Sequence, residues 1–207
     1  MKQKFTISSN AFKWALLSGF VCAIFLSMAQ FNAACDDLRT NVLRLHIIAN
    51  SDSQIDQSVK LKVRDSILED SGEIFSGTED IDSAIIKSQK SLSEFERIAE
   101  NVLRENGFEY SADAKISKSY FETREYDDFT LPAGEYPSLI ITLGEGKGKN
   151  WWCVIFPEIC IPTAMSEASL SDTVTKKSAG IAEEPERYIM KFKIVEIYED
   201  LKKSLKL

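Results

Sequence analysis

The feature that most constrains this chain is an apolar segment close to its N-terminus. Residues 14–29 (WALLSGFVCAIFLSMA) form sixteen consecutive positions without a charge, and the residues before them include Lys2, Lys4 and Lys13 and no acid. A basic start followed by an apolar stretch of this length is typical of a secretory signal peptide. We therefore predict that residues 1–29 direct export and that the rest of the chain folds outside the cytoplasm.

Two fates of this segment after export are open. Ser27 and Ala29 form the small-residue pattern at which signal peptides are cleaved. An apolar window extended to Phe12 and Phe31 approaches the roughly 20 residues that span a bilayer. The segment is therefore either a cleaved signal peptide or an N-terminal membrane anchor.

The charge of the chain excludes one class of function. The whole sequence has 25 basic and 32 acidic residues, a net charge of −7. Because residues 1–29 contribute three lysines, the remainder has 22 basic and 32 acidic groups and a net charge of −10. Nucleic-acid binding needs a clustered positive field, so we expect no nucleic-acid partner. A purely electrostatic attraction to anionic membranes is also disfavoured, and we expect membrane contact only through an uncleaved N-terminal segment.

Export changes what the four cysteines mean, because oxidising compartments allow disulfides. Cys153 and Cys160 are separated by six residues that include Pro157, and a bend there would bring them close enough to pair. The alternative is that Cys153 faces a core and both thiols stay reduced. Cys22 belongs to the apolar segment, and Cys35 is expected to be an odd thiol near the new N-terminus, unpaired or lost.

Hydrophobic periodicity predicts a strand and two long helices in the first half of the exported part. Alternating apolar residues place a strand at residues 41–50, with His46 on the face opposite its leucines. Ser53 and Asp56 have the spacing of a capping box. The helix that follows them would bury Ile55, Val59, Val63 and Ile67. A second helix is predicted over residues 79–105.

The second half combines strand-forming segments with a polar segment and a last helix. Aromatic and β-branched residues predict strands at residues 115–126, 138–143 and 151–156, the last two joined by a glycine-rich hairpin. Residues 163–184 are small, polar and aperiodic, which predicts a flexible excursion. The final helix would start at Pro185 and bury Met190, Ile194, Ile197, Leu201 and Leu205.

This order of elements predicts an α+β fold. We expect an antiparallel or mixed sheet packed against two long helices and a C-terminal helix. Residues 36–162 and 185–207 would form a single domain, from which the polar segment 163–184 projects.

The residues that could carry chemistry have simpler structural explanations. His46 is the single imidazole, and the sequence places no serine or cysteine nucleophile beside it. Asn50, Asp52 and Asp56 lack the glycine and the distal glutamate of a calcium loop. Residues 144–150 lack the spacing of a phosphate-binding loop. We therefore expect no catalytic residues, no metal and no cofactor.

Two adjacent tryptophans indicate a binding surface. Trp151 and Trp152 lie on a predicted strand, where successive side chains point to opposite faces, so at least one should be partly exposed. Tryptophan is enriched at the energetic centres of protein interfaces. The alternative is that both are packed, one in the core and one beneath a helix.

Two blocks of the sequence carry a resemblance to a known family. They are LRLHIIANSDSQIDQSVKLKVRDSIL, beginning at Leu43, and LPAGEYPSLIITLGEGKGKNWWCVIFPEIC, ending at Cys160. In this order they resemble the stage II sporulation protein R family of endospore-forming bacteria. The resemblance spans nearly the whole exported part, and the terminal helix is compatible with it.

The resemblance implies a signalling role. Members of this family are made in the forespore and exported into the space between the forespore and mother-cell membranes. There they activate a membrane-embedded, aspartic-type protease of the mother cell that processes the sigma-E precursor. The family supplies no catalytic residues. At matching positions, the expected structural or partner-contact residues are His46, Asn50, Asp52, Arg64, Arg124, Trp151 and Trp152.

The chain departs from the family pattern at two positions, and one rival function remains. Glu122 and Glu158 stand where the family usually has prolines, which affects local turn geometry and partner contact. The rival hypothesis is an exported hydrolase acting on cell wall or peptide. Such an enzyme would need His46 or a pair of carboxylates as its catalytic groups.

Overall fold

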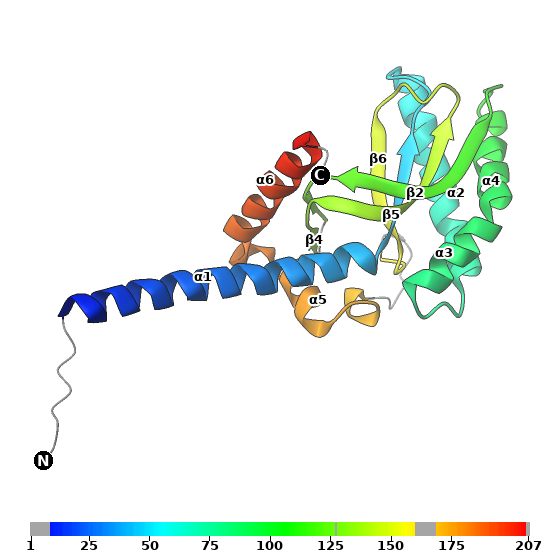
Figure 1. Cartoon of the computed structure of the whole chain (residues 1–207). Helices are drawn as coiled ribbons and strands as arrows, with labels where there is room; N and C mark the ends of the chain where they lie inside the picture. The colour runs from blue at the N-terminus through cyan, green and yellow to red at the C-terminus, as the bar shows by residue number, and fades with distance from the viewer. Residues whose placement is uncertain (1–8, 127, 160–168, 206–207) are drawn as a thin grey trace, which may run out of the picture.

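The chain folds into a mixed sheet flanked by helices, with one long helix extending away from the body (Figure 1). This computed structural model describes residues 9–126, 128–159 and 169–205. The longer helices are α1 (Ser9–Thr40), α2 (Gln54–Phe75), α3 (Ile81–Lys90), α4 (Leu92–Glu105), α5 (Lys176–Glu183) and α6 (Ile189–Leu205). Two short 3-10 helices are η1 (Leu170–Asp172) and η2 (Pro185–Arg187). The predicted α+β class is confirmed.

The main sheet has four strands in the order β2-β5-β1-β6. They are β1 (Leu43–Ile48), β2 (Ala112–Phe121), β5 (Gly134–Leu143) and β6 (Asn150–Phe156). The central strands β1 and β5 run parallel, whereas β2 and β6 pair antiparallel with their neighbours. A small two-stranded ribbon, β3 (Arg124–Glu125) with β4 (Thr130–Leu131), connects β2 to β5. The sheet is therefore of the mixed type.

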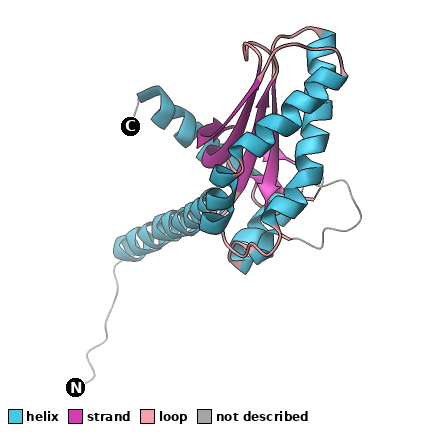
Figure 2. Ribbon diagram, turned by 90° about the vertical axis from the view of Figure 1, so that its right-hand side faces the viewer, coloured by secondary structure: helices cyan, strands magenta, loops and turns pink. Residues whose placement is uncertain are grey.

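The helices α2, α3 and α4 cover one face of the sheet (Figure 2). As predicted, the Ser53 side chain caps α2 by accepting a hydrogen bond from the backbone N–H of Asp56. Val59, Val63 and Ile67 are buried in the core beneath, whereas Ile55, expected in the same stripe, is 69% exposed. Ile55 lies in the first turn of α2.

The prediction of a single helix over residues 79–105 is wrong, because the helix is interrupted at Ser91. This residue has φ −100° and ψ 12°, outside the helical region, and its N–H bonds to the carbonyls of Lys87 and Ser88. Serine is a poor interior helix residue because its hydroxyl competes for backbone groups. The break produces α3, which contacts β1 and β2, and α4, which contacts β2 and α2.

The other face of the sheet is partly covered by the end of α1, by α5 and by the β3–β4 ribbon. The buried residues of this second core include Leu38 within α1, Val42 just after it, Val154 on β6, and Ala179 and Ala182 on α5. The expectation of a flexible excursion over residues 163–184 is therefore wrong for residues 170–183. Their small side chains allow α5 to pack closely against α1. Residues 160–168 lie outside the described part of the chain.

The folded body begins inside α1 and upstream of residue 36. Phe31 and Cys35 are buried in a third core together with Ile181 of α5 and Phe192 of α6. Cys35 is therefore a core residue and not a dispensable terminal thiol, and burial raises the pKa of its thiol to about 12. The preceding part of α1 is long and apolar enough to cross a membrane, with 6% of its most apolar window buried. This is compatible with export or with membrane anchoring.

The C-terminal helix α6 packs with a face other than the predicted one. Phe192, Val195 and Glu199 are buried, and Glu199 lies 3.7 Å from the guanidinium of Arg39 on α1. The stripe expected to be buried is exposed instead, with Met190 at 74% and Leu201 at 57%. Periodicity correctly identified an apolar face, but it carries no information about which neighbour covers it.

We predict that Phe31→Ala destabilises the folded body by about 3–5 kcal/mol, because its ring packs at 5.1 Å from Phe192 and 5.6 Å from Tyr188. Phe25→Ala is the matched control, since Phe25 is 72% exposed on the same helix. Urea unfolding of the full chain in mild detergent measures both variants. Equal midpoints for the two would show that α1 is not part of the core.

Candidate functional site

The two sequence blocks that carry the family resemblance meet at one end of the sheet. The loop after β1 lies against the hairpin between β5 and β6. The amide of Asn50 donates to Asp56 at 3.1 Å, and its oxygen accepts from the N–H of Glu145 at 2.9 Å. The Asp52 carboxylate accepts from the N–H of Lys149 at 2.7 Å. We call this contact between residues 49–56 and residues 144–149 the loop–hairpin clasp.

Glycines make this close approach possible. A β-carbon on Gly148 would lie 2.2 Å from the carbonyl oxygen of Ser51. One on Gly144, whose φ is +56°, would lie 2.3 Å from the side-chain oxygen of Asn50. The N–H groups of Lys147 and Gly148 donate to the carbonyls of Asn50 and Ala49. Because these donors are already used, the hairpin does not act as a phosphate loop.

Asp56 is the centre of the clasp. Its carboxylate accepts hydrogen bonds from Asn50, from the Ser51 hydroxyl and, at 2.7 Å, from the Tyr110 hydroxyl. Burial acts to raise the pKa of Asp56, but these hydrogen bonds together outweigh it and the pKa is lowered. A carboxylate surrounded by donors is not a cation ligand. Among the described residues no group of three or more His, Cys, Asp or Glu side chains is arranged to hold a metal.

His46 and Arg44 project from the opposite side of β1 to the leucines, as predicted for His46. Arg44 is fully buried, with its guanidinium carbon 3.8 Å from the centroid of the Phe121 ring and one nitrogen donating to the Tyr126 hydroxyl. The His46 ring packs edge-on against Phe121 and Trp152. Both of its nitrogens are buried without a hydrogen-bond partner in the described part of the chain.

The environment of His46 favours the neutral ring. Burial lowers its pKa, the charge of Arg44 lowers it further, and the nearby Asn150 side chain acts in the opposite direction. A general base must reach the proton that it removes, whereas both ring nitrogens of this half-buried imidazole are covered. The geometry therefore favours a packing role for His46.

Two rows of cross-strand neighbours lie on the part of this sheet face that the helices do not cover. The strand register aligns them as Lys115, Ile140, His46 and Trp152 in one row and Asp113, Thr142, Ile48 and Asn150 in the next. All except Ile140 are half-buried or exposed. We call these eight residues the open sheet face. Arg124 borders it, with its guanidinium carbon 6.0 Å from the Trp152 ring centroid.

The two tryptophans point to opposite faces, as predicted, and both are half-buried. Trp152 belongs to the open sheet face. Trp151 packs against the first core, and the guanidinium of Arg64 on α2 lies 4.4 Å above its ring. The seven residues expected at structural or contact positions therefore occupy three separate places. Asn50 and Asp52 form the clasp, Arg64 and Trp151 lie on the helical side, and the remaining three lie on or beside the open sheet face.

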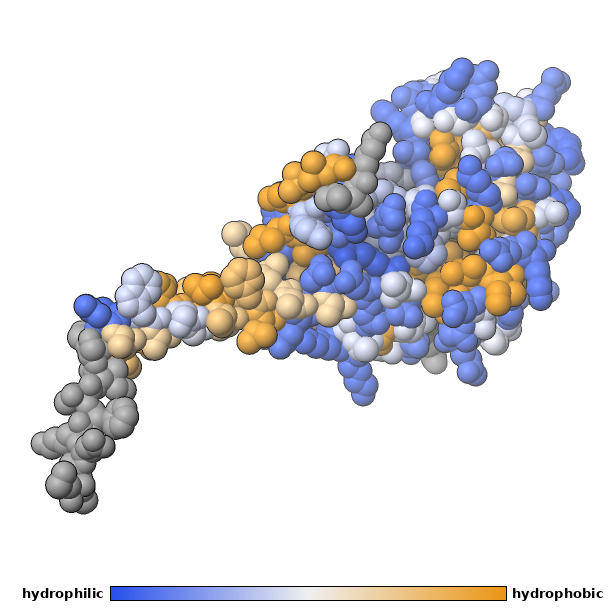
Figure 3. Space-filling model, in the orientation of Figure 1, coloured by the Kyte–Doolittle hydropathy of each residue, from blue (hydrophilic) through white to orange (hydrophobic). Residues whose placement is uncertain are grey.

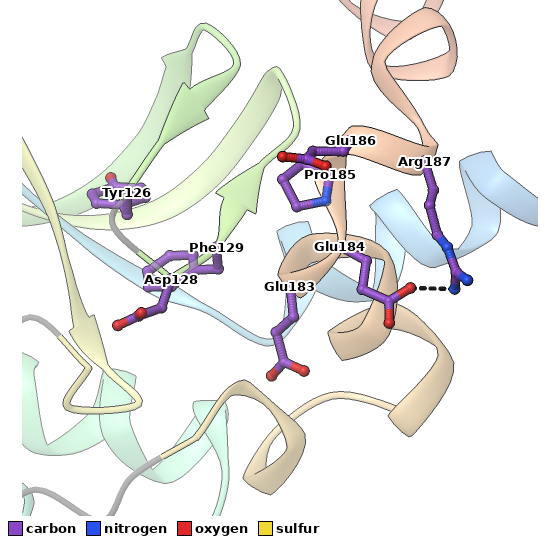
Figure 4. A pocket seen from close by; sticks show the side chains of 8 residues that line it. All are labelled: Tyr126, Asp128, Phe129, Glu183, Glu184, Pro185, Glu186 and Arg187. Atoms are coloured by element: carbon purple, nitrogen blue, oxygen red, sulfur yellow. Dashed lines mark hydrogen bonds and ion pairs between the residues drawn. The ribbon is translucent and has the colours of Figure 1, made fainter.

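A pocket of about 500 Å³ opens between the β3–β4 ribbon and the start of the last helical region (Figure 4). Tyr126 and Phe129 stack at 4.7 Å between ring centroids on one side, and Glu184 forms an ion pair with Arg187 on the other. Neither this pocket nor the burial of Arg44 was anticipated. The sequence signal for the buried arginine was its position between two leucines of a predicted strand.

The remaining sequence expectations have mixed outcomes. Cys153 is buried on β6, but Cys160 lies outside the described residues, so the disulfide stays a prediction. Glu122 is exposed directly after β2, where a proline is not needed to end the strand. Glu158 follows the cis peptide bond at Pro157, and burial raises its pKa.

We predict that Asp56→Asn loosens the clasp and lowers the free energy of unfolding by about 1–3 kcal/mol at pH 7, because the new amide group faces hydrogen-bond donors. The lowered pKa stabilises the native state above about pH 4, the ordinary range of an aspartate, and this contribution disappears as the pH falls through the native value. Denaturant unfolding at pH 7 and at a pH below the native pKa should therefore show the difference from wild type shrinking in acid. Asp113→Asn, at an exposed position of β2, is the control, and an equal loss there would contradict the assignment.

Comparison with known proteins agrees with these two blocks. The family model for stage II sporulation protein R matches residues 39–166, which include both halves of the clasp and the open sheet face. The stage II sporulation protein R of Bacillus subtilis (strain 168) is 40% identical over 123 residues, covering 57% of this chain and 53% of that protein. The match thus spans about half the length of this relative. No solved structure matches the chain. With most of its folded body matched by the family model, the chain belongs to the stage II sporulation protein R family.

Proposed function

We propose that this protein is an exported sporulation signal that activates a membrane-embedded protease. In this proposal the protein is made in the forespore and acts in the space between the two membranes. Its partner is the aspartic-type protease of the mother cell that processes the sigma-E precursor. Family membership supports the link to sporulation, and the apolar N-terminal helix is compatible with delivery across the forespore membrane.

The open sheet face is the observation that carries the proposal. It presents the half-buried Trp152 and His46 rings with apolar Ile48 beside them and with the exposed Arg124 at the border. Aromatic and arginine side chains are the groups most enriched at interface hot spots. A sheet face that is apolar at its centre and charged at its edge, at Lys115 and Arg124, matches the anatomy of a protein-binding surface.

The hydrolase hypothesis receives less support from the structure. Its most concrete version uses His46 as a base, but both nitrogens of this half-buried ring are covered and its pKa is lowered. The family residues Asn50 and Asp52 are occupied with backbone hydrogen bonds in the clasp. We therefore infer that the family motifs build and present a surface, and that the protein acts on the protease without breaking a bond itself.

Deletion and complementation in a spore-forming host test this proposal. We predict that deleting the gene leaves the sigma-E precursor unprocessed and that the wild-type chain restores processing. Trp152→Ala should fail to restore it, because this side chain forms part of the contact surface. Trp151→Ala is the matched control, since it is also half-buried and also lies beneath an arginine, but on the other face.

Immunoblots of the precursor report activation, and melting temperatures of the purified variants report folding. Normal processing in the deletion strain would overturn the proposal. If the activity of the two tryptophan variants simply follows their melting temperatures, the open sheet face is not the contact surface. Retained signalling in a folded His46→Gln variant would remove the version of the hydrolase alternative that uses His46 as its base.

A further inference from the structure

The C-terminal helix α6 carries an exposed apolar stripe that the folded body does not cover. Met190, Ile194, Ile197, Leu201 and Leu205 recur at helical spacing along one side and are 48–74% exposed. The opposite side of the helix is the one that packs, through Phe192, Val195 and Glu199. A helix with two apolar sides needs a second apolar neighbour, because leaving five large side chains in water is unfavourable.

The stripe is continuous with the exposed part of α1. An apolar crevice of about 350 Å³ lies between the two helices, and its lining residues are Phe25, Met28, Ala29, Asn32, Ile194, Val195 and Tyr198. In Figure 3 the hydrophobic surface of α6 runs into that of the projecting helix α1. The Nζ of Lys191 donates to the Ser27 hydroxyl at 2.8 Å, which places the start of α6 beside the end of the apolar segment.

The charges around the stripe also indicate a lipid surface. By helical spacing, Lys191 and Lys202 flank one side of the stripe and Lys193 flanks the other. Of the nearby acids, Glu199 is buried, Asp200 accepts a hydrogen bond from Tyr120 at 2.6 Å, and Glu196 pairs with Lys193 at 2.7 Å. Lysines at the borders of an apolar helix face are typical of helices that lie in the headgroup region of a bilayer.

We propose that α6 is an interfacial helix that lies on the same membrane that α1 enters, with its apolar stripe among the phospholipid acyl chains. The inference takes the apolar part of α1 as embedded in the bilayer and does not depend on the proposed protease partner. The start of α6 lies beside the end of the apolar segment of α1. When that segment is embedded in the bilayer, the stripe therefore lies at the bilayer surface. The two helices together then fix the orientation of the body relative to the membrane.

This membrane contact is compatible with the acidic body. Electrostatics alone would not attract a surface with a net charge of −10 to anionic lipids. The stripe instead supplies apolar area, and the flanking lysines add little net charge, because Lys193 pairs with Glu196 and Lys202 lies 3.8 Å from Glu199.

Site-specific photo-crosslinking in pure lipid tests this proposal. The full chain is reconstituted into vesicles of phosphatidylethanolamine and phosphatidylglycerol, and only the floating, membrane-bound fraction is irradiated. Benzoylphenylalanine at Ile197 or Leu201 should crosslink to phospholipid with about ten times the yield of the same probe at Ile86, because acyl chains surround the stripe. Ile86 is the matched control, as it is 50% exposed on α3 across the sheet.

Two outcomes would overturn the proposal. A lipid yield at Ile197 and Leu201 equal to that at Ile86 would show that the stripe does not meet the bilayer. A covalent dimer would show that a second copy covers it. The double variant Ile197→Ser and Leu201→Ser, with the probe at Ile194, should lose most of the lipid crosslink without a change in melting temperature, since both side chains are exposed. No protease is present, so failure here leaves the proposed function intact.

Discussion

The hydrogen bonds that converge on Asp56 are the constraint on which the rest of the site depends. They join the loop after β1 to the start of α2 and, through Asn50, to the hairpin that positions β6. Without that connection, the hairpin would be held to this loop only by Asp52 and by the backbone hydrogen bonds of residues 147–149. The two family blocks thus share one structural effect, which is to fix the register of an edge strand.

That register determines which side chains the protein presents. Pairing of His46 with Trp152 places both rings on the face where α1 and α5 provide only partial cover. A slip of one residue would exchange Trp152 for Trp151 and move the exposed ring to the helical side. The buried Arg44 supports the same arrangement, because Phe121 contacts its guanidinium as well as the rings of His46 and Trp152. The clasp therefore fixes the register of β6, and the register determines which side chains form the open sheet face.

Sequence periodicity predicted the strand around His46, the buried stripe Val59, Val63 and Ile67, and the opposite orientation of the two tryptophans. Those features follow from local rules. Periodicity failed for the buried face of α6, because it does not tell which side of the helix meets the body, and the stripe that begins at Met190 is exposed. It also failed for α5, because small residues such as Ala179 are packed as tightly as large ones. The break at Ser91 was missed because apolar spacing continues across it. Asn50 and Asp52 were recognised as motif residues, but their partners lie about a hundred positions away in sequence.

In the proposed function, this folded body activates a membrane-embedded protease by contact. The most direct measurement is cleavage of the purified sigma-E precursor by that protease in vesicles, with the full-length protein reconstituted in the apposed membrane or withheld. The account predicts that cleavage rises strongly when the protein is present and that Arg124→Ala, at an exposed border position, lowers the gain while Arg64→Ala does not. Equal cleavage with and without the protein would contradict it.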